Sequence, residues 1–70
     1  MREWLKKLRE SEGLTQKQAA EKLNITESYY SYIEAGERQK QMDITLAQKI
    51  SSAFHVTVEQ IVEFESTEKV

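Results

Sequence analysis

The stretch that decides the fold runs from Thr15 to Gly36 and reads TQKQAAEKLNITESYYSYIEAG. It contains two short helical patterns, each begun by a threonine, and a glycine follows the second. A threonine hydroxyl can accept a hydrogen bond from a free amide of the first helical turn. A glycine just past a helix adopts the left-handed conformation without a steric clash. Three residues, 24–26, separate the two patterns, so we predict helices over about 16–23 and 27–35 joined by a sharp corner.

The inner faces of these two helices follow from the spacing of apolar residues. Ala19, Ala20 and Leu23 share one face of the first helix, and their small size lets another helix cross closely. In the second helix we expect Tyr30 and Ile33 to face inward. Both sets are needed for a corner this tight, because each helix must bury its apolar side against the other.

Three further helices are predicted around this pair. Residues 2–11 carry apolar residues at helical spacing. Asp43 can cap a helix over about 44–54, and Thr57, with a glutamine three residues later, has the spacing of a capping box before a helix over about 58–64. The predicted fold class is therefore all-α, a compact five-helix domain with a helix-turn-helix at its second and third helices.

The size of the chain sets its domain organisation. Seventy residues make one domain, which we place at residues 1–65, followed by a tail over residues 66–70 that we expect to be disordered. A chain of this size buries only about 60% of its unfolded surface, so its own core leaves a small stability margin. Because there is no cysteine and one histidine, His55, disulfides and histidine-rich metal sites are excluded, and association with a second copy is the remaining support.

Composition excludes several classes of function. No apolar run approaches the roughly 20 residues of a membrane span, and the N-terminus has no apolar core of a secretory signal. We therefore expect a cytoplasmic protein with no membrane partner. No glycine-rich phosphate loop, catalytic cysteine or plausible carboxylate pair is present, so we expect neither an enzyme nor a cofactor or metal.

The net charge of −2 is unevenly distributed. Through residue 40 there are 8 Lys/Arg against 7 Asp/Glu, and after it 2 against 5. The acidic excess thus lies in the C-terminal part of the chain. Nucleic-acid-binding domains are usually basic, so this balance counts mildly against such a partner, although a few well-placed cations suffice for phosphate contacts.

At this point the sequence resembles the lambda-repressor-like family of helix-turn-helix domains, of the Cro/CI or XRE type. The resemblance spans residues 2–62. The residues that carry it are Leu8-Arg9, Gly13-Leu14-Thr15-Gln16, Ala20, Asn24-Ile25-Thr26, Ile33-Glu34 and Gly36, followed by Leu46, Ile50 and Val56. The pattern is specific for the fold and says much less about which promoter is bound.

The resemblance implies that the third helix lies in the major groove of double-stranded DNA, with its N-terminal part at the base edges. On this chain the base-reading positions are Glu27, Ser28 and Tyr32, with Thr26 and Ser31 beside them. Glu27 departs from the family pattern. It could accept a hydrogen bond from a cytosine amino group, or it could only stabilise the first helical turn through the helix dipole.

The resemblance also implies contacts that anchor and support this helix. Gln16 stands where the family sets the start of the second helix against a phosphate, with Lys17 next to it, and Arg38 and Lys40 can add phosphate contacts from the following loop. Arg9 and Glu34 match an ion pair that joins the first helix to the third in the family. One helix reads few base pairs, so we expect a homodimer, and we assign its contact to the last helix: Val58, Val62 and Phe64.

The sequence thus predicts a sequence-specific DNA-binding regulator of transcription, a repressor of prokaryotic or phage type, that binds a two-fold site as a homodimer and blocks or contacts RNA polymerase. A prophage repressor, a restriction-modification controller and an autoregulating antitoxin are equally compatible with it. The alternative is a protein-interaction module, such as an antitoxin or adaptor, that keeps the fold and binds a protein partner. The acidic balance and Glu27 favour that alternative.

Overall fold

The capping residues set where each helix begins in the computed structural model, which describes residues 1–36 and 43–68. Thr15 Oγ1 accepts a hydrogen bond from the Gln18 amide (3.1 Å), and the Gln18 side chain accepts one from the Thr15 amide (2.9 Å), which completes a capping box. Thr57 and Gln60 form the same reciprocal pair. The capping box predicted at Thr57 is therefore confirmed, and the threonine predicted to begin α2 forms a second one.

Five helices occupy the described part of the chain: α1 (Glu3–Ser11), α2 (Gln16–Leu23), α3 (Glu27–Ala35), α4 (Ile44–Phe54) and α5 (Val58–Glu68). This confirms the predicted all-α, five-helix class. The last helix runs four residues beyond the predicted end at Phe64. Its final turn has little apolar content, and Thr67 Oγ1 donates a hydrogen bond to the Glu63 carbonyl there (2.9 Å). The expected disordered tail, residues 66–70, overlaps this turn, and residues 69–70 lie outside the described residues.

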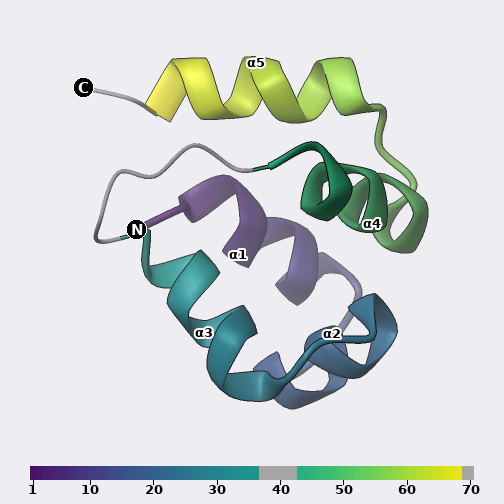
Figure 1. Cartoon of the computed structure of the whole chain (residues 1–70). Coiled ribbons are helices and arrows are strands. Elements are labelled where there is room, and N and C mark those ends of the chain that lie inside the picture. Colours follow the sequence, from purple (N-terminus) through teal and green to yellow (C-terminus); the bar gives the residue numbers. More distant parts are fainter. Residues whose placement is uncertain (37–42, 69–70) are drawn as a thin grey trace.

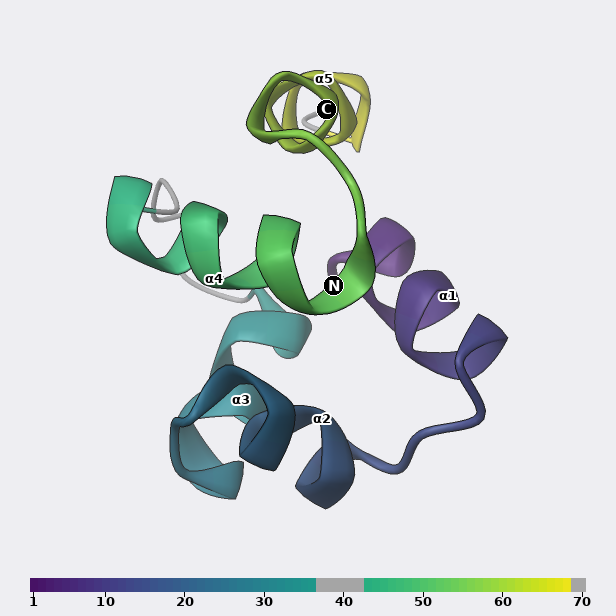
Figure 2. The same cartoon turned by 90° about the vertical axis from the view of Figure 1, so that its right-hand side faces the viewer.

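The helices form three levels, seen in two perpendicular views (Figures 1 and 2). The corner of α2 and α3 lies at one end of the domain, α5 crosses the opposite end, and α1 and α4 lie between them. Because α5 is at the far end, the outer sides of α2 and α3 are left uncovered by it. The helix-turn-helix is thus presented at one end of a body that measures 28 × 23 × 21 Å along its principal axes.

The core lies where the inner faces of all five helices meet. Its fully buried members include Leu5, Ala19, Tyr30, Ile50 and Ile61, one from each helix. The predicted inward faces of α2 and α3 are confirmed, since Ala19, Ala20 and Leu23 and also Tyr30 and Ile33 are buried. Tyr30 is the largest of the fully buried side chains.

Within residues 1–36 and 43–68, two non-glycine residues take the left-handed conformation, and both end helices. Asn24 (φ 61°) ends α2 and forms the corner that the sequence places there, and His55 (φ 60°) ends α4. Asparagine tolerates this conformation well, whereas histidine does so less readily. The Asn24 turn sets the direction of α3, and the His55 turn sets that of α5.

Candidate nucleic-acid interface

The outward side of α3 is polar and exposed. Glu27, Ser28 and Tyr32 are exposed, and Ser31 is half-buried. Thr26 caps the helix, because its Oγ1 accepts a hydrogen bond from the Tyr29 amide (3.1 Å). That use occupies the Thr26 oxygen as an acceptor and leaves its hydroxyl proton free to donate. The predicted base-reading residues therefore lie together at the start and on the outer side of one helix.

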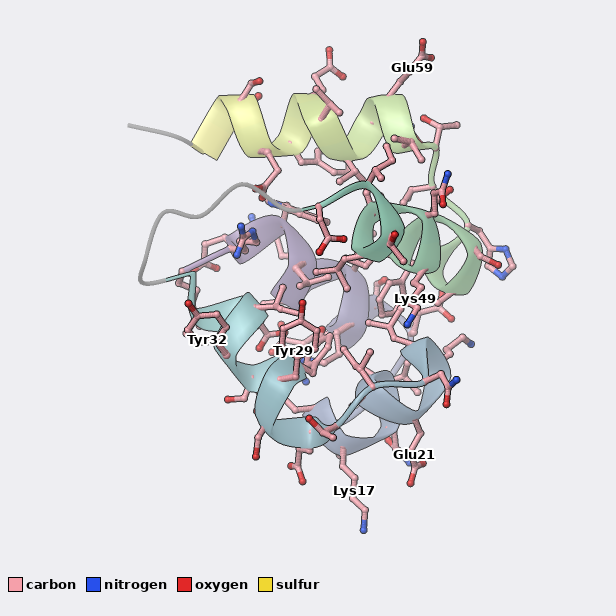
Figure 3. All side chains as sticks on the ribbon, viewed as in Figure 1. Lys17, Glu21, Tyr29, Tyr32, Lys49 and Glu59 are labelled. Atoms are coloured by element: carbon pink, nitrogen blue, oxygen red, sulfur yellow. The ribbon has the colours of Figure 1, made fainter. Side chains whose placement is uncertain are left out.

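Two tyrosines of α3 are also exposed. The exposed fractions of Tyr29 and Tyr32 are 42% and 45%, whereas Tyr30 between them is fully buried. Figure 3 shows both exposed tyrosines on α3. Of these three tyrosines, Tyr30 alone is part of the buried core, as predicted from the helical spacing.

The N-terminus of α2 lies beside the outward side of α3. Its residue Gln16 makes a hydrogen bond inside the domain that the sequence did not predict. The Gln16 side chain is half-buried, and its Nε2 donates a hydrogen bond to Glu34 Oε1 (2.8 Å). An amide nitrogen carries two protons, so one remains to donate outward. Lys17 is exposed and extends away from the body of the domain (Figure 3). The resemblance supplied no internal partner for Gln16.

Glu34 organises the inner side of α3. Among the described residues it is the one polar or charged residue that is buried, at 1% exposure. Arg9 Nε and Nη2 donate to its two oxygens (2.9 and 3.3 Å), Gln16 donates to Oε1, and the Tyr30 hydroxyl donates to Oε2 (3.0 Å). The expected Arg9–Glu34 ion pair is therefore present, and it is part of a larger network that ties α1, α2 and α3 together.

The electrostatics of this network follow from its burial. Burial raises the pKa of Glu34, but the hydrogen bonds from Arg9, Gln16 and Tyr30 outweigh it, so the net pKa lies below its usual value. Burial, aided by the adjacent Glu34 carboxylate, raises the pKa of Tyr30. The hydrogen bond to Glu34 raises the pKa of Arg9. All three shifts favour a charged pair with a neutral tyrosine, which holds α3 in one orientation near neutral pH.

A comparison with protein families decides the family. A family model described as helix-turn-helix matches residues 5–61, most of the chain. The chain belongs to this helix-turn-helix family, of the lambda-repressor-like (XRE) type. The resemblance drawn from the motif residues is thereby confirmed. No curated protein and no solved structure matches the chain significantly.

Membership of the family suggests a DNA-binding regulator of the XRE type. It also makes a non-enzymatic role the expected one. Within residues 1–36 and 43–68, the longest helices have 11 residues, and none has the length and apolar character needed to cross a membrane.

A second set of contacts in this helix-turn-helix domain joins α1, α3 and α5. Arg2 Nε and Nη2 donate to the Glu65 carboxylate (2.8 and 3.1 Å), and Trp4 Nε1 donates to the same group (2.8 Å). Arg2 also donates through Nη1 to the Ile33 carbonyl (2.6 Å) and through its amide to the Glu34 carbonyl (2.8 Å). These contacts fix the C-terminal end of α3, and sequence reasoning missed them.

The residues assigned to the dimer contact do not share one exposed face. Phe64 stacks on Trp4 within the same chain, with ring centroids 5.4 Å apart and an interplanar angle of 28°. Val58 is also partly buried against the core, whereas Val62 is 59% exposed. The apolar pattern of α5 is therefore largely used inside the protomer, and of the three residues Val62 is the one available to a partner. Arg38 and Lys40, the remaining predicted phosphate contacts, lie outside the described residues.

Proposed function

We propose that this chain is a sequence-specific DNA-binding regulator of transcription that inserts α3 into the major groove. The observation that carries the proposal is the two-sided character of α3. Its inner side is held by the Glu34 network. On its outer side, Ser28 and Tyr32 are exposed, and their hydroxyl groups make no hydrogen bond with any described residue. A rigid helix with a polar, unoccupied side is what a major groove accepts, because the groove is wide enough for one α-helix.

Phosphate contacts would come from the end of α2. The first amides of a helix lack intrahelical partners and carry a partial positive charge, which suits a phosphate oxygen. The second Nε2 proton of Gln16 and the ammonium of Lys17 lie at this end, and Arg38 and Lys40, which follow α3 in the sequence, would add positive charge. Internal bonding of Gln16 to Glu34 supports this role, because it limits the rotamers that Gln16 must lose on binding.

The proposed binding unit is a homodimer on a two-fold site. A single α3 reaches few base pairs, and two copies centred about 34–36 Å apart would read two half-sites on one side of the duplex. Repression would follow from occupancy of the promoter, by blocking RNA polymerase or by contacting it. The exposed Val62 supports a contact through α5.

Selection of bound duplexes from random DNA tests this function. We expect a two-fold consensus from the wild-type chain. The double variant S28A/Y32A should lose sequence preference at the base pairs that these two side chains face, because both side chains are exposed and their loss leaves the core intact. Unchanged preference in the double variant would refute the assignment of α3 as the reading helix.

Salt dependence tests the phosphate contacts separately. Lys17, Arg38 and Lys40 in two protomers would neutralise roughly six phosphates, so the logarithm of affinity should fall against the logarithm of salt concentration with a slope of about −5. Strong binding that does not change with salt would contradict phosphate anchoring. Sedimentation of the complex would report whether two protomers are bound.

A protein-interaction module is the second candidate, and one observation favours it. The outward side of α3 carries Glu27 and two exposed tyrosines, and α3 contains no lysine or arginine. Exposed tyrosines are common at protein interfaces. Recovery of one specific protein by the immobilised chain, with no retention on any DNA of the random pool, would select this function.

A further inference from the structure

The hydrogen-bonding groups on the outward side of α3 form an unusual set for a reading helix. From Glu27 to Ala35 there is no lysine, arginine, asparagine or glutamine. Guanine is most often read by Arg or Lys at O6 and N7, and adenine by Asn or Gln at N6 and N7. Neither base therefore has its usual partner on this helix. The groups present are the Glu27 carboxylate and the hydroxyls of Ser28, Tyr29, Ser31 and Tyr32.

Glu27 is the group with the narrowest chemistry in this set. An ionised carboxylate only accepts hydrogen bonds, whereas a hydroxyl can donate or accept. Glu27 is the first residue of α3 and is exposed, and its side chain makes no hydrogen bond or ion pair with any residue in 1–36 or 43–68. On DNA, the first residues of a reading helix are those that reach base edges. The carboxylate would thus enter the groove with its accepting capacity unused.

We infer that Glu27 is a specificity-determining residue that selects a cytosine in each half-site. This inference rests on the proposed DNA-binding function. In the major groove, cytosine presents an N4 amino donor, while guanine presents the acceptors N7 and O6 and thymine presents O4 and a methyl group. Adenine has an N6 donor, but its N7 acceptor lies beside it and would face the second carboxylate oxygen. Cytosine is therefore the base that can donate a hydrogen bond to the Glu27 carboxylate without placing an acceptor of its own against it.

The Glu27 carboxylate also weakens binding to DNA sites that lack this cytosine. A charge that loses water without gaining a hydrogen bond is costly, and the neighbouring phosphates add repulsion. Specificity is a difference of affinities, so a group that penalises wrong partners contributes to it as much as one that favours the right partner. Glu27 lowers affinity for DNA in general and lowers it least where cytosine stands. A role confined to the helix dipole would instead act equally on every sequence.

The experiment compares the wild-type chain with the variant Glu27→Gln. Both are subjected to selection from a random duplex pool, and affinities are then measured on duplexes that differ at one base pair. For the wild type, replacing the selected cytosine by thymine should weaken binding by about tenfold or more. In the variant the preference at that position should move to adenine, because a glutamine amide both donates to N7 and accepts from N6.

Glu21→Gln is the matched control. Glu21 is exposed on α2, at the same end of the domain as Lys17 (Figure 3), and its replacement removes the same charge. It should raise affinity for all duplexes alike and leave the base preference unchanged. Melting curves of both variants should stay close to that of the wild type, since neither side chain is buried.

Two results would overturn the inference, and they are distinguishable. If the wild type selects a site but Glu27→Gln keeps the same preference at every position, Glu27 does not read a base, while the DNA-binding function stands. If the wild type selects no sequence at all, the DNA-binding function fails and the inference fails with it. A wild-type consensus without cytosine at any position contacted by the start of α3 would also refute it.

Discussion

Replacing Glu34 with glutamine should remove much of the stability of the domain. The side chain is buried and accepts four hydrogen bonds, two on each oxygen. Glutamine has the same shape but one accepting oxygen, so its NH₂ must face Arg9 in either orientation. Tyr30 and Gln16 can reorient to accept from the new NH₂, whereas the guanidinium of Arg9 has no acceptor. The variant therefore leaves a cation without its counterion, with 12% of the Arg9 side chain exposed.

The magnitude follows from this burial. Removing one partner of a buried ion pair costs about 3–5 kcal/mol, and we expect the lower end because Arg9 keeps its bond to the Leu14 carbonyl (2.9 Å). A chain of 70 residues has a total stability of roughly 4–10 kcal/mol. A loss of about 3 kcal/mol corresponds to a fall in Tm of roughly 12–24 °C for a domain of this size. The variant should thus melt far earlier and be partly unfolded under mild denaturation.

Urea denaturation followed by circular dichroism measures this loss. Protein concentration must be held constant, because association would add concentration-dependent stability. Glu63→Gln makes the same chemical change at an exposed position of α5 and should alter stability by less than about 0.5 kcal/mol. Tyr30→Phe removes one of the four hydrogen bonds and should cost about 1 kcal/mol. A loss below about 1 kcal/mol in Glu34→Gln would refute the view that the network holds the helix-turn-helix together.

Three further predictions concern pH, a helix end and the last helix. The pKa of Glu34 is lower in the folded state than its unfolded value of 4.5, so the ionised carboxylate stabilises the fold above that pH and this stabilisation is lost as pH falls. The difference in unfolding free energy between wild type and Glu34→Gln should therefore narrow when urea titrations are repeated in acid. His55→Gly relieves a left-handed residue (φ 60°) and should add about 0.5 kcal/mol, seen as a higher Tm. Glu65→Gln removes the carboxylate shared by Arg2 and Trp4, so it should cost about 1–2 kcal/mol and shift the fluorescence of the single tryptophan; an unchanged spectrum would contradict that docking.

The helix boundaries could be predicted because the signals that set them are local. Thr15, Thr26, Asp43 and Thr57 each lie three residues from the atom that completes the cap. Spacing of that kind can be read directly from the chain. The exception is the end of α5, where no local stop signal follows Phe64 and the helix continues to Glu68.

The sequence predicts which residues of the candidate site are exposed on α3, but it does not predict the contacts that Gln16 and Phe64 make inside the domain. The exposed positions Glu27, Ser28 and Tyr32 follow from helical periodicity once Tyr30 and Ile33 are assigned inward. The Gln16–Glu34 contact does not follow, because both residues are polar and either could face water. Similarly, the partially buried state of Phe64 depends on Trp4, 60 positions earlier in the chain, so the apolar pattern of α5 alone suggested a free face.

The chain order of caps, turns and apolar positions is therefore sufficient for the five helices and for the corner between α2 and α3, since each of these depends on atoms a few residues apart. The contacts that give the corner its orientation are different. Glu34 collects donors from α1, α2 and α3, and Arg2 joins α3 to Glu65 on α5, 63 positions away. Which polar groups become buried partners depends on how the helices pack, because burial removes the water that would otherwise satisfy each of them separately.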